Sequence, residues 1–212
     1  MCAAHYATTE APLFAGDVQP LAAGTPTSAE RILRVAEDFR RGSVALDEPV
    51  LLVLCPTVVD TTRTPNGHHT LKVVGLQPYK LPGGSERWDD LMPEVADSNL
   101  NHLRKYAPNL TDEVILATSL KCPLDLERMN AHNWHGSCHG GDMSPDQSGE
   151  LRPVHGWADH RTPIPGLYQT GATTHPGGSV SAGPGRNAAI ELLGSSIEAA
   201  IYPSHPVTLV YH

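Results

Sequence analysis

A strand, a glycine-rich connection and a helix follow one another near the end of the 212-residue chain, and they constrain its fold more than any other feature. Gly166–Ala172 (GLYQTGA) has the pattern of a strand, His175–Gly185 (HPGGSVSAGPG) is the connection, and Arg186–Ala200 has apolar residues at helical spacing. Because glycine lacks a Cβ atom, such a backbone can approach a flat or charged ligand closely. The helix N-terminus adds unpaired N–H groups that suit a phosphate or a developing anion. The pattern indicates a ligand site, with a purely structural turn as the alternative.

Other well-known ligand and nucleophile motifs are absent from the sequence. The glycine-rich unit is not a G-x-G-x-x-G dinucleotide fingerprint at the start of a βαβ unit, and no Gly-Lys-Ser/Thr follows it as in a P-loop. No G-x-S-x-G elbow of a serine hydrolase occurs. Cys55 ends an apolar run and is expected in the core rather than at an active site.

Composition and charge exclude further classes of protein. The chain has 40% apolar and 18% charged residues, which is typical of a globular protein. Its formal net charge of -8, with no block of Lys or Arg, argues against nucleic-acid binding. No apolar run approaches the roughly 20 residues that cross a bilayer, and the first residues lack the pattern of a secretory signal. Four cysteines without a C-x-x-C pair predict a reduced, cytoplasmic protein, with a membrane-peripheral location as an alternative.

The first clear helix is predicted over Thr27–Arg41. Thr27 and Glu30 fit a capping box, and Gly42 stands where a C-terminal cap is expected. The predicted apolar face consists of Ile32, Leu33, Val35, Ala36 and Phe39. The preceding segments, His5–Phe14 and Gly16–Thr27, have no clear strand or helix pattern.

Three more strands and two more helices are predicted upstream of the glycine-rich unit. The strands are Val50–Cys55, His69–Gln77 and Glu113–Leu120, and the helices are Trp88–Tyr106 and Pro123–Met129. Asn66-Gly67 is a turn signal that makes the first two strands neighbours. Pro93 is expected to break or kink the first helix. Asn130–Pro165, rich in Gly, His, Pro and Asp, is predicted to be a long functional or packed loop.

Three stretches of the sequence resemble a known family. Arg161–Ala189 (RTPIPGLYQTGATTHPGGSVSAGPGRNAA) closely resembles the C-terminal motif of phytoene dehydrogenase-like FAD-dependent oxidoreductases of the carotenoid desaturase type. Leu120–Gln147 is similar to the family's upstream pattern, and HYATTEAPLFAG resembles its substrate-binding region more weakly. The resemblance implies an α+β fold. Residues 1–152 would be a substrate-domain fragment with a mixed sheet and helices, and residues 153–212 would be the closing strand and helix of the FAD domain.

The resemblance also implies FAD as the cofactor. Gly171 and Ala172 would lie beside the pyrophosphate and ribityl chain, and His175–Val180 would pass under the isoalloxazine ring. The implied cofactor-binding residues are Gly171, Ala172, His175, Pro176, Gly177, Gly178, Ser179, Val180, Gly185 and Asn187. Many relatives carry three consecutive glycines where this chain has Gly177-Gly178-Ser179. Because serine is small, flavin approach is expected to survive this difference.

The implied reaction is hydride transfer from a substrate C–H bond to flavin N5, which depends on exact placement in a dry pocket. His175 and His139 are the candidate catalytic residues, since a histidine beside a flavin can orient substrate or take a proton. For both, the alternative is a hydrogen-bonded loop histidine. Asp142 and Asp146 are expected to be turn or solvent residues.

The family's N-terminal G-x-G-x-x-G motif and its acidic ribose-binding residue do not occur in this sequence. We therefore expect the chain to act as the C-terminal half or subunit of a split enzyme, with a partner that carries the dinucleotide-binding half. Alone, it is expected to bind FAD weakly or not at all. The substrate is expected to be small and lipophilic. The alternatives are a non-catalytic partner subunit, a truncated flavoprotein and a flavin-dependent isomerase.

A metal site is the main rival from the residues themselves. His132, His135, Cys138 and His139 in HNWHGSCH are zinc-ligand types. Their spacing does not match a standard closed site, and no second ligand pair stands at a typical distance. No metal is therefore expected.

Overall fold

The computed structural model describes residues 1–137, 139–178 and 181–194, and it divides into two compact units. The first is Met1–Ala131, and the second begins at His132. The boundary expected after residue 152 lies inside the second unit, because Arg152 is hydrogen-bonded to backbone on both sides of it, as far as Ala172. The assignment of the two parts to a substrate domain and an FAD domain stays a prediction.

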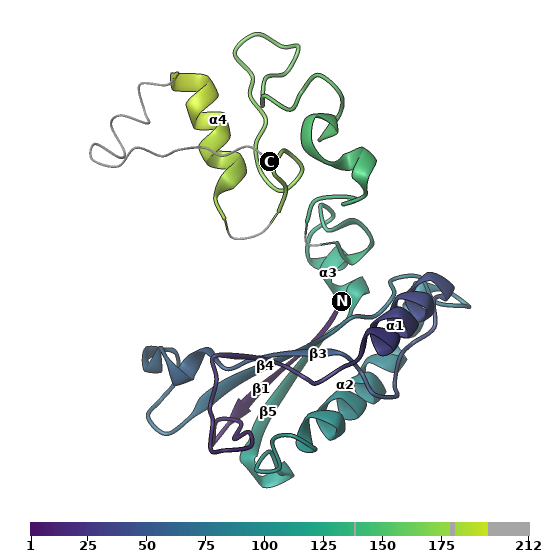
Figure 1. Cartoon of the computed structure of the whole chain (residues 1–212), viewed down its shortest axis with the longest axis vertical. Helices are drawn as coiled ribbons and strands as arrows, with labels where there is room; N and C mark the ends of the chain where they lie inside the picture. Colours follow the sequence, from purple (N-terminus) through teal and green to yellow (C-terminus); the bar gives the residue numbers. More distant parts are fainter. Residues whose placement is uncertain (138, 179–180, 195–212) are drawn as a thin grey trace. The chain divides into compact units, whose positions relative to one another are not determined.

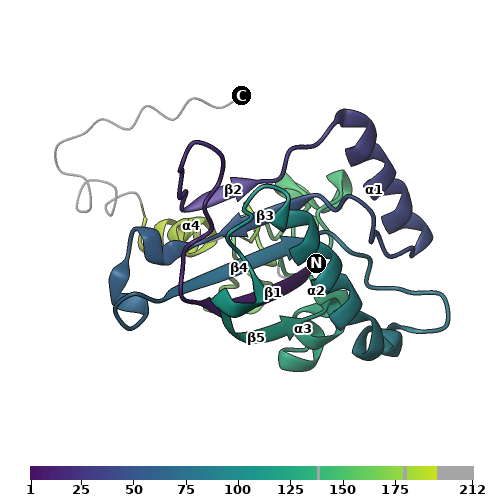
Figure 2. The same ribbon diagram turned by 90° about the horizontal axis from the view of Figure 1, so that it is seen from below.

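The first unit is built on a five-stranded sheet in the order β2-β3-β4-β1-β5 (Figures 1 and 2). Its strands are β1 (Cys2–Thr8), β2 (Ala22–Gly24), β3 (Leu51–Leu54), β4 (His69–Gly75) and β5 (Ile115–Lys121). Every pairing is antiparallel, where a mixed sheet was expected. The connection from β3 to β4, residues 55–68, contains only short 3-10 turns and no α-helix of the kind that usually crosses over between parallel strands. The unit is nevertheless α+β.

The central strand β1 was not predicted from the sequence. It pairs with β4 from Cys2↔Gly75 to Thr8↔His69 and with β5 on its other side. Its residues alternate as a strand should, with Ala4 and Tyr6 buried and His5 exposed. Three of its seven residues are alanine, which is depleted in strands, so the composition hid the alternation. The short edge strand β2 was also not predicted.

The elements that were predicted by their apolar runs are present. β3, β4 and β5 lie within two residues of their predicted bounds. β3 and β4 are neighbours as expected, and they pair antiparallel. Helix α3 spans Pro123–Met129, as predicted. Cys55 is buried in the core, which was also expected.

Helix α1 spans Ala29–Arg41 and differs from expectation in two ways. Its N-cap is Ser28 rather than Thr27, because the Ser28 hydroxyl accepts the hydrogen bond from the Arg31 N–H. Gly42 caps the other end in the left-handed conformation, as predicted. Of the predicted apolar face only Val35 is buried, and the exposed members are Ile32, Leu33 and Phe39.

Helix α2 spans Trp88–Arg104 and covers one face of the sheet (Figure 1). The helix runs through Pro93 without ending, so the predicted break is absent. A proline inside a helix costs about 3 kcal/mol, whereas burying one large apolar side chain contributes about 1.5–3 kcal/mol. The side chains of α2 that enter the core are Trp88, Met92, Val95, Ala96, Leu100 and Leu103. Their burial therefore outweighs the cost of the proline.

The second unit consists mainly of turns. Asn130–Pro165 holds no strand among its described residues, only short 3-10 turns after α3, in agreement with the predicted long loop. Gly166–Ala172 is not the predicted strand, because its backbone forms one isolated bridge, Arg161↔Tyr168, and has no strand partner in the described part of the unit. Helix α4 spans Gly183–Leu193 and begins three residues before the predicted start. It ends at its C-cap Gly194, inside the predicted range, and residues 195–200 of the predicted helix lie outside the described residues. None of the described helices has the length and apolar character needed to cross a membrane.

Candidate functional site

The guanidinium group of Arg152 organises the predicted cofactor segment. Arg152 is 3% exposed, and its hydrogen bonds go to backbone carbonyl oxygens. Nη1 donates to Asp142 (2.7 Å) and Gln147 (3.2 Å), and Nη2 donates to His139 (2.9 Å), Gly140 (3.3 Å) and Ala172 (2.7 Å). A buried charge is tolerated only when it is well hydrogen-bonded, and the planar fork of arginine suits several acceptors at once. One side chain thus joins the histidine-rich loop to the glycine-rich segment.

Thr174 fixes the turn that follows. Its N–H and hydroxyl donate to the Gly171 carbonyl at 3.0 and 2.9 Å, and its own carbonyl accepts the Gly177 N–H at 2.7 Å. Thr174 is fully buried. Neither Arg152 nor Thr174 was predicted as a site residue. No periodicity or motif spacing identifies a side chain that forms hydrogen bonds with backbone groups elsewhere in the sequence.

Two of the predicted cofactor glycines have open space where a Cβ atom would stand. Gly171 has φ +110°, and no atom lies within 4 Å of an ideal Cβ built there. Gly185 lies in the first turn of α4 and is equally open. At these positions the backbone is accessible to a ligand, as the predicted cofactor site requires.

The other glycines of the segment are explained by packing. A Cβ atom on Gly178 would stand 2.9 Å from His139 Nδ1 and 3.0 Å from His139 Cα. A Cβ atom on Gly183 would stand 2.9 Å from Pro176 Cγ. Gly177 is buried, has φ +107° and faces the side chain of Met143. Flavin approach and a structural turn were the two reasons considered for the glycine-rich connection, and at these positions the structure shows a packing reason.

The two candidate catalytic histidines lie on the two segments that Arg152 joins. The side chain of His139 is exposed and lies against Gly178, so a candidate catalytic residue and a candidate cofactor residue are in contact. His175 is half-buried and precedes the exposed Pro176. Ser179 and Val180, which were also predicted to bind the cofactor, lie outside the described residues. The catalytic role of both histidines stays a prediction.

The N-terminus of α4 has no side-chain cap. Its N-cap, Ala182, has φ +56° and no side-chain acceptor, although the Gly183 N–H reaches the Ser181 hydroxyl at 3.2 Å. Asn187, the last predicted cofactor residue, is half-buried in the following turn. The helix is held from its other end by Arg161, whose guanidinium forms an ion pair with Glu191.

The histidine-rich loop shows no metal centre in the part that the structure describes. No three His, Cys, Asp or Glu side chains among the described residues could hold a metal ion together. Cys138, one of the four ligand types considered, lies outside those residues. Asp142 accepts hydrogen bonds from the N–H groups of Met143 (2.7 Å) and Ser144 (3.1 Å), so it is the turn residue that was predicted. The Asp146 side chain is exposed.

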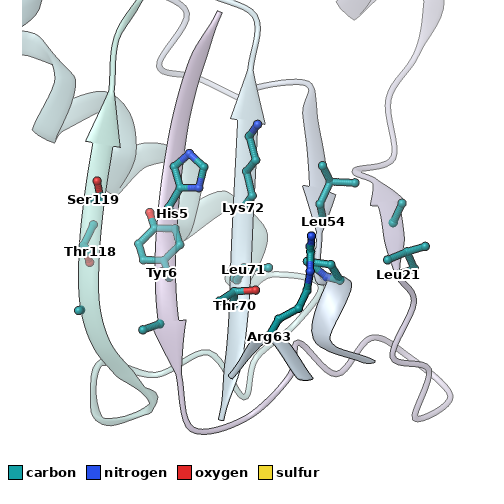
Figure 3. A pocket seen from close by; sticks show the side chains of 14 residues that line it. His5, Tyr6, Leu21, Leu54, Arg63, Thr70, Leu71, Lys72, Thr118 and Ser119 are labelled. Atoms are coloured by element: carbon teal, nitrogen blue, oxygen red, sulfur yellow. The ribbon is translucent and has the colours of Figure 1, made fainter. Parts of the chain in front are cut away.

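A second candidate site is a groove on the sheet of the first unit (Figure 3). It has a volume of about 740 Å³ and a mostly apolar lining. The lining residues with side chains on the groove face include Ala7, Leu54, Thr70, Lys72, Ala117 and Ser119. This face is opposite to the one that buries Tyr6, Leu71 and Val53 in the core. The groove was not predicted from the sequence, because β1 had not been recognised as the central strand.

The charged groups around the groove are mostly basic. His5 on β1 stands directly opposite Lys72 on β4. The pKa of His5 is lowered, first by burial and then by the positive charges of Lys72 and Lys121. Arg63 Nε lies 3.4 Å from the carboxylate of Asp60, so its charge is partly offset. The groove therefore offers an apolar floor with a neutral imidazole and an ammonium group.

Comparison with known proteins gives relatives of this chain. The "Pyridine nucleotide-disulfide oxidoreductase domain-containing protein 2" of Rattus norvegicus is 34% identical over 160 residues, which cover 74% of this chain and 27% of the relative. The protein of the same name from Mus musculus is 34% identical over 159 residues, with the same coverage. This chain is related to oxidoreductases. The relationship supports an enzyme role at the general level of an oxidoreductase. That the enzyme is of the phytoene desaturase type stays a prediction.

A third relative is a subunit of the limonene dehydrogenase of Castellaniella defragrans. It is 29% identical to this chain over 126 residues, which cover 59% of this chain and 23% of the relative. The chain thus spans about a quarter of the length of the curated relatives it matches. No family model matches the chain.

Proposed function

We propose that the chain contributes the substrate-binding and cofactor-closing parts of an FAD-dependent oxidoreductase that transfers hydride from a substrate C–H bond to flavin N5. The dinucleotide-binding half would come from a partner chain or segment with a G-x-G-x-x-G motif. The observation that carries the proposal is the backbone held by Arg152 and Thr174, which ends in open glycine positions and an uncapped helix N-terminus. The oxidoreductase relatives give independent support.

The residues of the second unit fit the part of a flavin site that this segment is proposed to form. At Gly171 and Gly185 no atom lies within 4 Å of the place where a Cβ atom would stand, so this space is open to a ligand. The N–H groups of the first turn of α4 suit the phosphate or the electron-rich edge of the flavin ring. When bound, FAD would supply the hydride acceptor. Gly171, Ala172, Gly185 and Asn187 are the described residues that we expect to hold it.

The chain's own side chains would then position the substrate and exclude water. His139 has an exposed ring beside Gly178 and can hold a proton or orient a substrate hydroxyl or carbonyl group. His175 is the second candidate for this role. Arg152 and Thr174 are positioning residues, because both are buried and act through backbone groups. The first unit, taken by itself, offers an apolar groove as a candidate surface for a lipophilic ligand.

The name of the third relative bears on both the partner and the substrate. That relative is named as one subunit of a dehydrogenase, which supports an enzyme composed of more than one chain. The same name gives limonene, an apolar hydrocarbon, as the compound on which that protein's enzyme acts. A small lipophilic substrate is therefore proposed for this chain as well.

An FAD titration with a matched pair of variants tests the proposal. The chain is titrated with FAD by flavin absorbance, alone and with a co-encoded protein that carries G-x-G-x-x-G. Tight binding is expected only with that partner. Gly185→Ala should weaken it severalfold, because the new Cβ enters the open space at the helix N-terminus. The chain itself should not lose stability, since alanine is the better helix former by up to about 1 kcal/mol.

Gly24→Ala is the control for this titration. Gly24 lies in the edge strand β2, where an added Cβ would meet only the Leu51 carbonyl oxygen at 3.9 Å. It should leave FAD binding unchanged. Equal FAD affinity of the Gly185→Ala and wild-type complexes would show that the α4 terminus does not meet the flavin. Tight binding by the chain alone would contradict the split-enzyme proposal.

A further inference from the structure

The groove on the sheet of the first unit has a charge opposite to that of the whole chain. The chain carries a formal net charge of -8, yet no Asp or Glu lines the groove among the described residues. Its charged lining residues are Arg63 and Lys72, and His5 is its titratable one (Figure 3). A basic region on an acidic protein produces a local field that attracts anions.

Lys72 is the cation whose charge is least compensated. Its side chain is half-buried in the middle of β4, and it forms no ion pair with any described residue. A further positive charge on the same face belongs to Lys121 of β5, whose strand partner on β1 is Ala3. Arg63, by contrast, forms an ion pair with Asp60 that partly offsets its charge. An ammonium group held above apolar side chains is more effective in attracting an anion than one in free solvent.

The remaining lining is apolar. Leu21, Leu54, Pro56, Ala7 and Ala117 supply carbon surface from several different segments of the first unit. These side chains can bury a hydrocarbon body, which contributes about 25 cal/mol for each Å² removed from water. The groove thus joins one unpaired ammonium group to an extended apolar floor.

We propose that this groove binds an amphiphile with a hydrocarbon body and a single anionic group, such as a carboxylate, that pairs with Lys72. The hydrocarbon body would lie along Leu54 and Ala117. Only the role of this ligand as the substrate rests on the proposed function, because the binding itself requires no flavin. The inference narrows the lipophilic substrate to a charged class.

His5 reports on the bound anion. The positive charges that act on it are those of Lys72 of β4 and Lys121 of β5. The other charged residue that lines the groove, Arg63, is paired with Asp60. A carboxylate placed against Lys72 would offset the positive charges that now lower the His5 pKa. The His5 pKa should therefore rise when an anionic amphiphile binds and should not rise when a neutral one binds.

The test compares decanoate with decanol as ligands of the full chain. Calorimetry gives the affinities, and the His5 ring protons give the His5 pKa by NMR titration. Decanoate should bind at least about fivefold tighter than decanol, which corresponds to roughly 1 kcal/mol for one charge-assisted contact. It should also raise the His5 pKa. Lys72→Gln should abolish this preference, whereas the same change at the exposed Lys80 should leave it intact.

The outcomes separate this inference from the proposed function. Equal binding of decanoate and decanol, or an unchanged preference in Lys72→Gln, would overturn the anionic class. No binding of either ligand would remove the groove as a site. If decanoate does not bind while FAD binds in the presence of the partner, the amphiphile site is wrong and the oxidoreductase proposal is unaffected. If decanoate binds while FAD binding fails, the amphiphile site stands and the flavin proposal falls.

Discussion

Arg152 and Ala172 are joined by a 2.7 Å hydrogen bond from the guanidinium Nη2 to the carbonyl oxygen, across a sequence separation of 20 residues. The same nitrogen donates to the His139 carbonyl at 2.9 Å. Hydrogen bonds with a charged donor are roughly twice as strong as neutral ones. A single buried cation thus sets the spacing between the candidate catalytic loop and the candidate cofactor segment.

Arg152→Lys should loosen the second unit although it keeps the charge. Lysine lacks the planar fork and has three donors, so several of the five carbonyl groups would lose their partner. We expect local opening to become easier by about 2 kcal/mol. Amide hydrogen exchange at Gly177, whose N–H is bonded to Thr174, measures this. Arg40→Lys, at an exposed position of α1, should leave that exchange rate within about twofold.

The sequence was informative where the chain buries a periodic apolar surface. β3, β4 and α3 follow from apolar runs and proline positions, and Gly42 follows from the left-handed conformation that a helix end favours. Such signals are local, so they can be read without knowing the partners of each segment. β1 is the counterexample, because its small residues become a strand only between β4 and β5.

The candidate site was less accessible to this reasoning. The sequence pattern identified the glycine-rich segment but not the reason for each glycine. Gly178 lacks a Cβ because His139 occupies the space, and this contact joins residues that are far apart in the chain. The expected strand over Gly166–Ala172 failed for the same kind of reason, since a strand needs a neighbour that no local pattern specifies.

Gly178→Ala should displace His139. The new Cβ would stand 3.0 Å from His139 Cα, which is backbone and cannot swing away as the end of a flexible side chain can. Overpacking of this kind costs about 1–3 kcal/mol. The measurement is the NMR shift of the His139 ring protons together with the urea midpoint of the second unit. An unchanged His139 signal, equal to that in Gly24→Ala, would show that the two residues are not in contact.

Gln77→Leu should destabilise the first unit. Gln77 is 2% exposed, and its side-chain amide accepts the Ala45 N–H at 3.0 Å and donates to the Ala45 carbonyl at 2.8 Å. Leucine has a similar volume but leaves both buried backbone groups unpaired, at about 1–3 kcal/mol each. Urea denaturation followed by Trp88 fluorescence should show a loss of at least about 2 kcal/mol. Gln19→Leu, at an exposed position, should change the value by less than about 0.5 kcal/mol.

His102 should make the first unit less stable as the pH falls. Both ring nitrogens are buried without a hydrogen-bond partner among the described residues, and burial lowers the His102 pKa below its usual 6.5. Lys105 and Arg31 add to this direction, and Glu48 and Asp47 oppose it. In the unfolded chain His102 takes up its proton near its usual pKa of 6.5, while the folded chain resists it. The unfolded state therefore binds more protons, and stability drops as the pH falls from about 6.5 through the lower folded pKa.

A comparison with His102→Gln isolates this effect. The other histidines titrate in both proteins, so their contributions cancel in the difference between wild type and variant. Because glutamine does not titrate, the wild type should lose stability relative to the variant between about pH 7 and pH 5. Urea midpoints at intervals across that range provide the measurement. A constant difference in stability over this pH range would mean that His102 is solvated or hydrogen-bonded in the folded protein. The description of its ring nitrogens as buried without a hydrogen-bond partner would then be wrong.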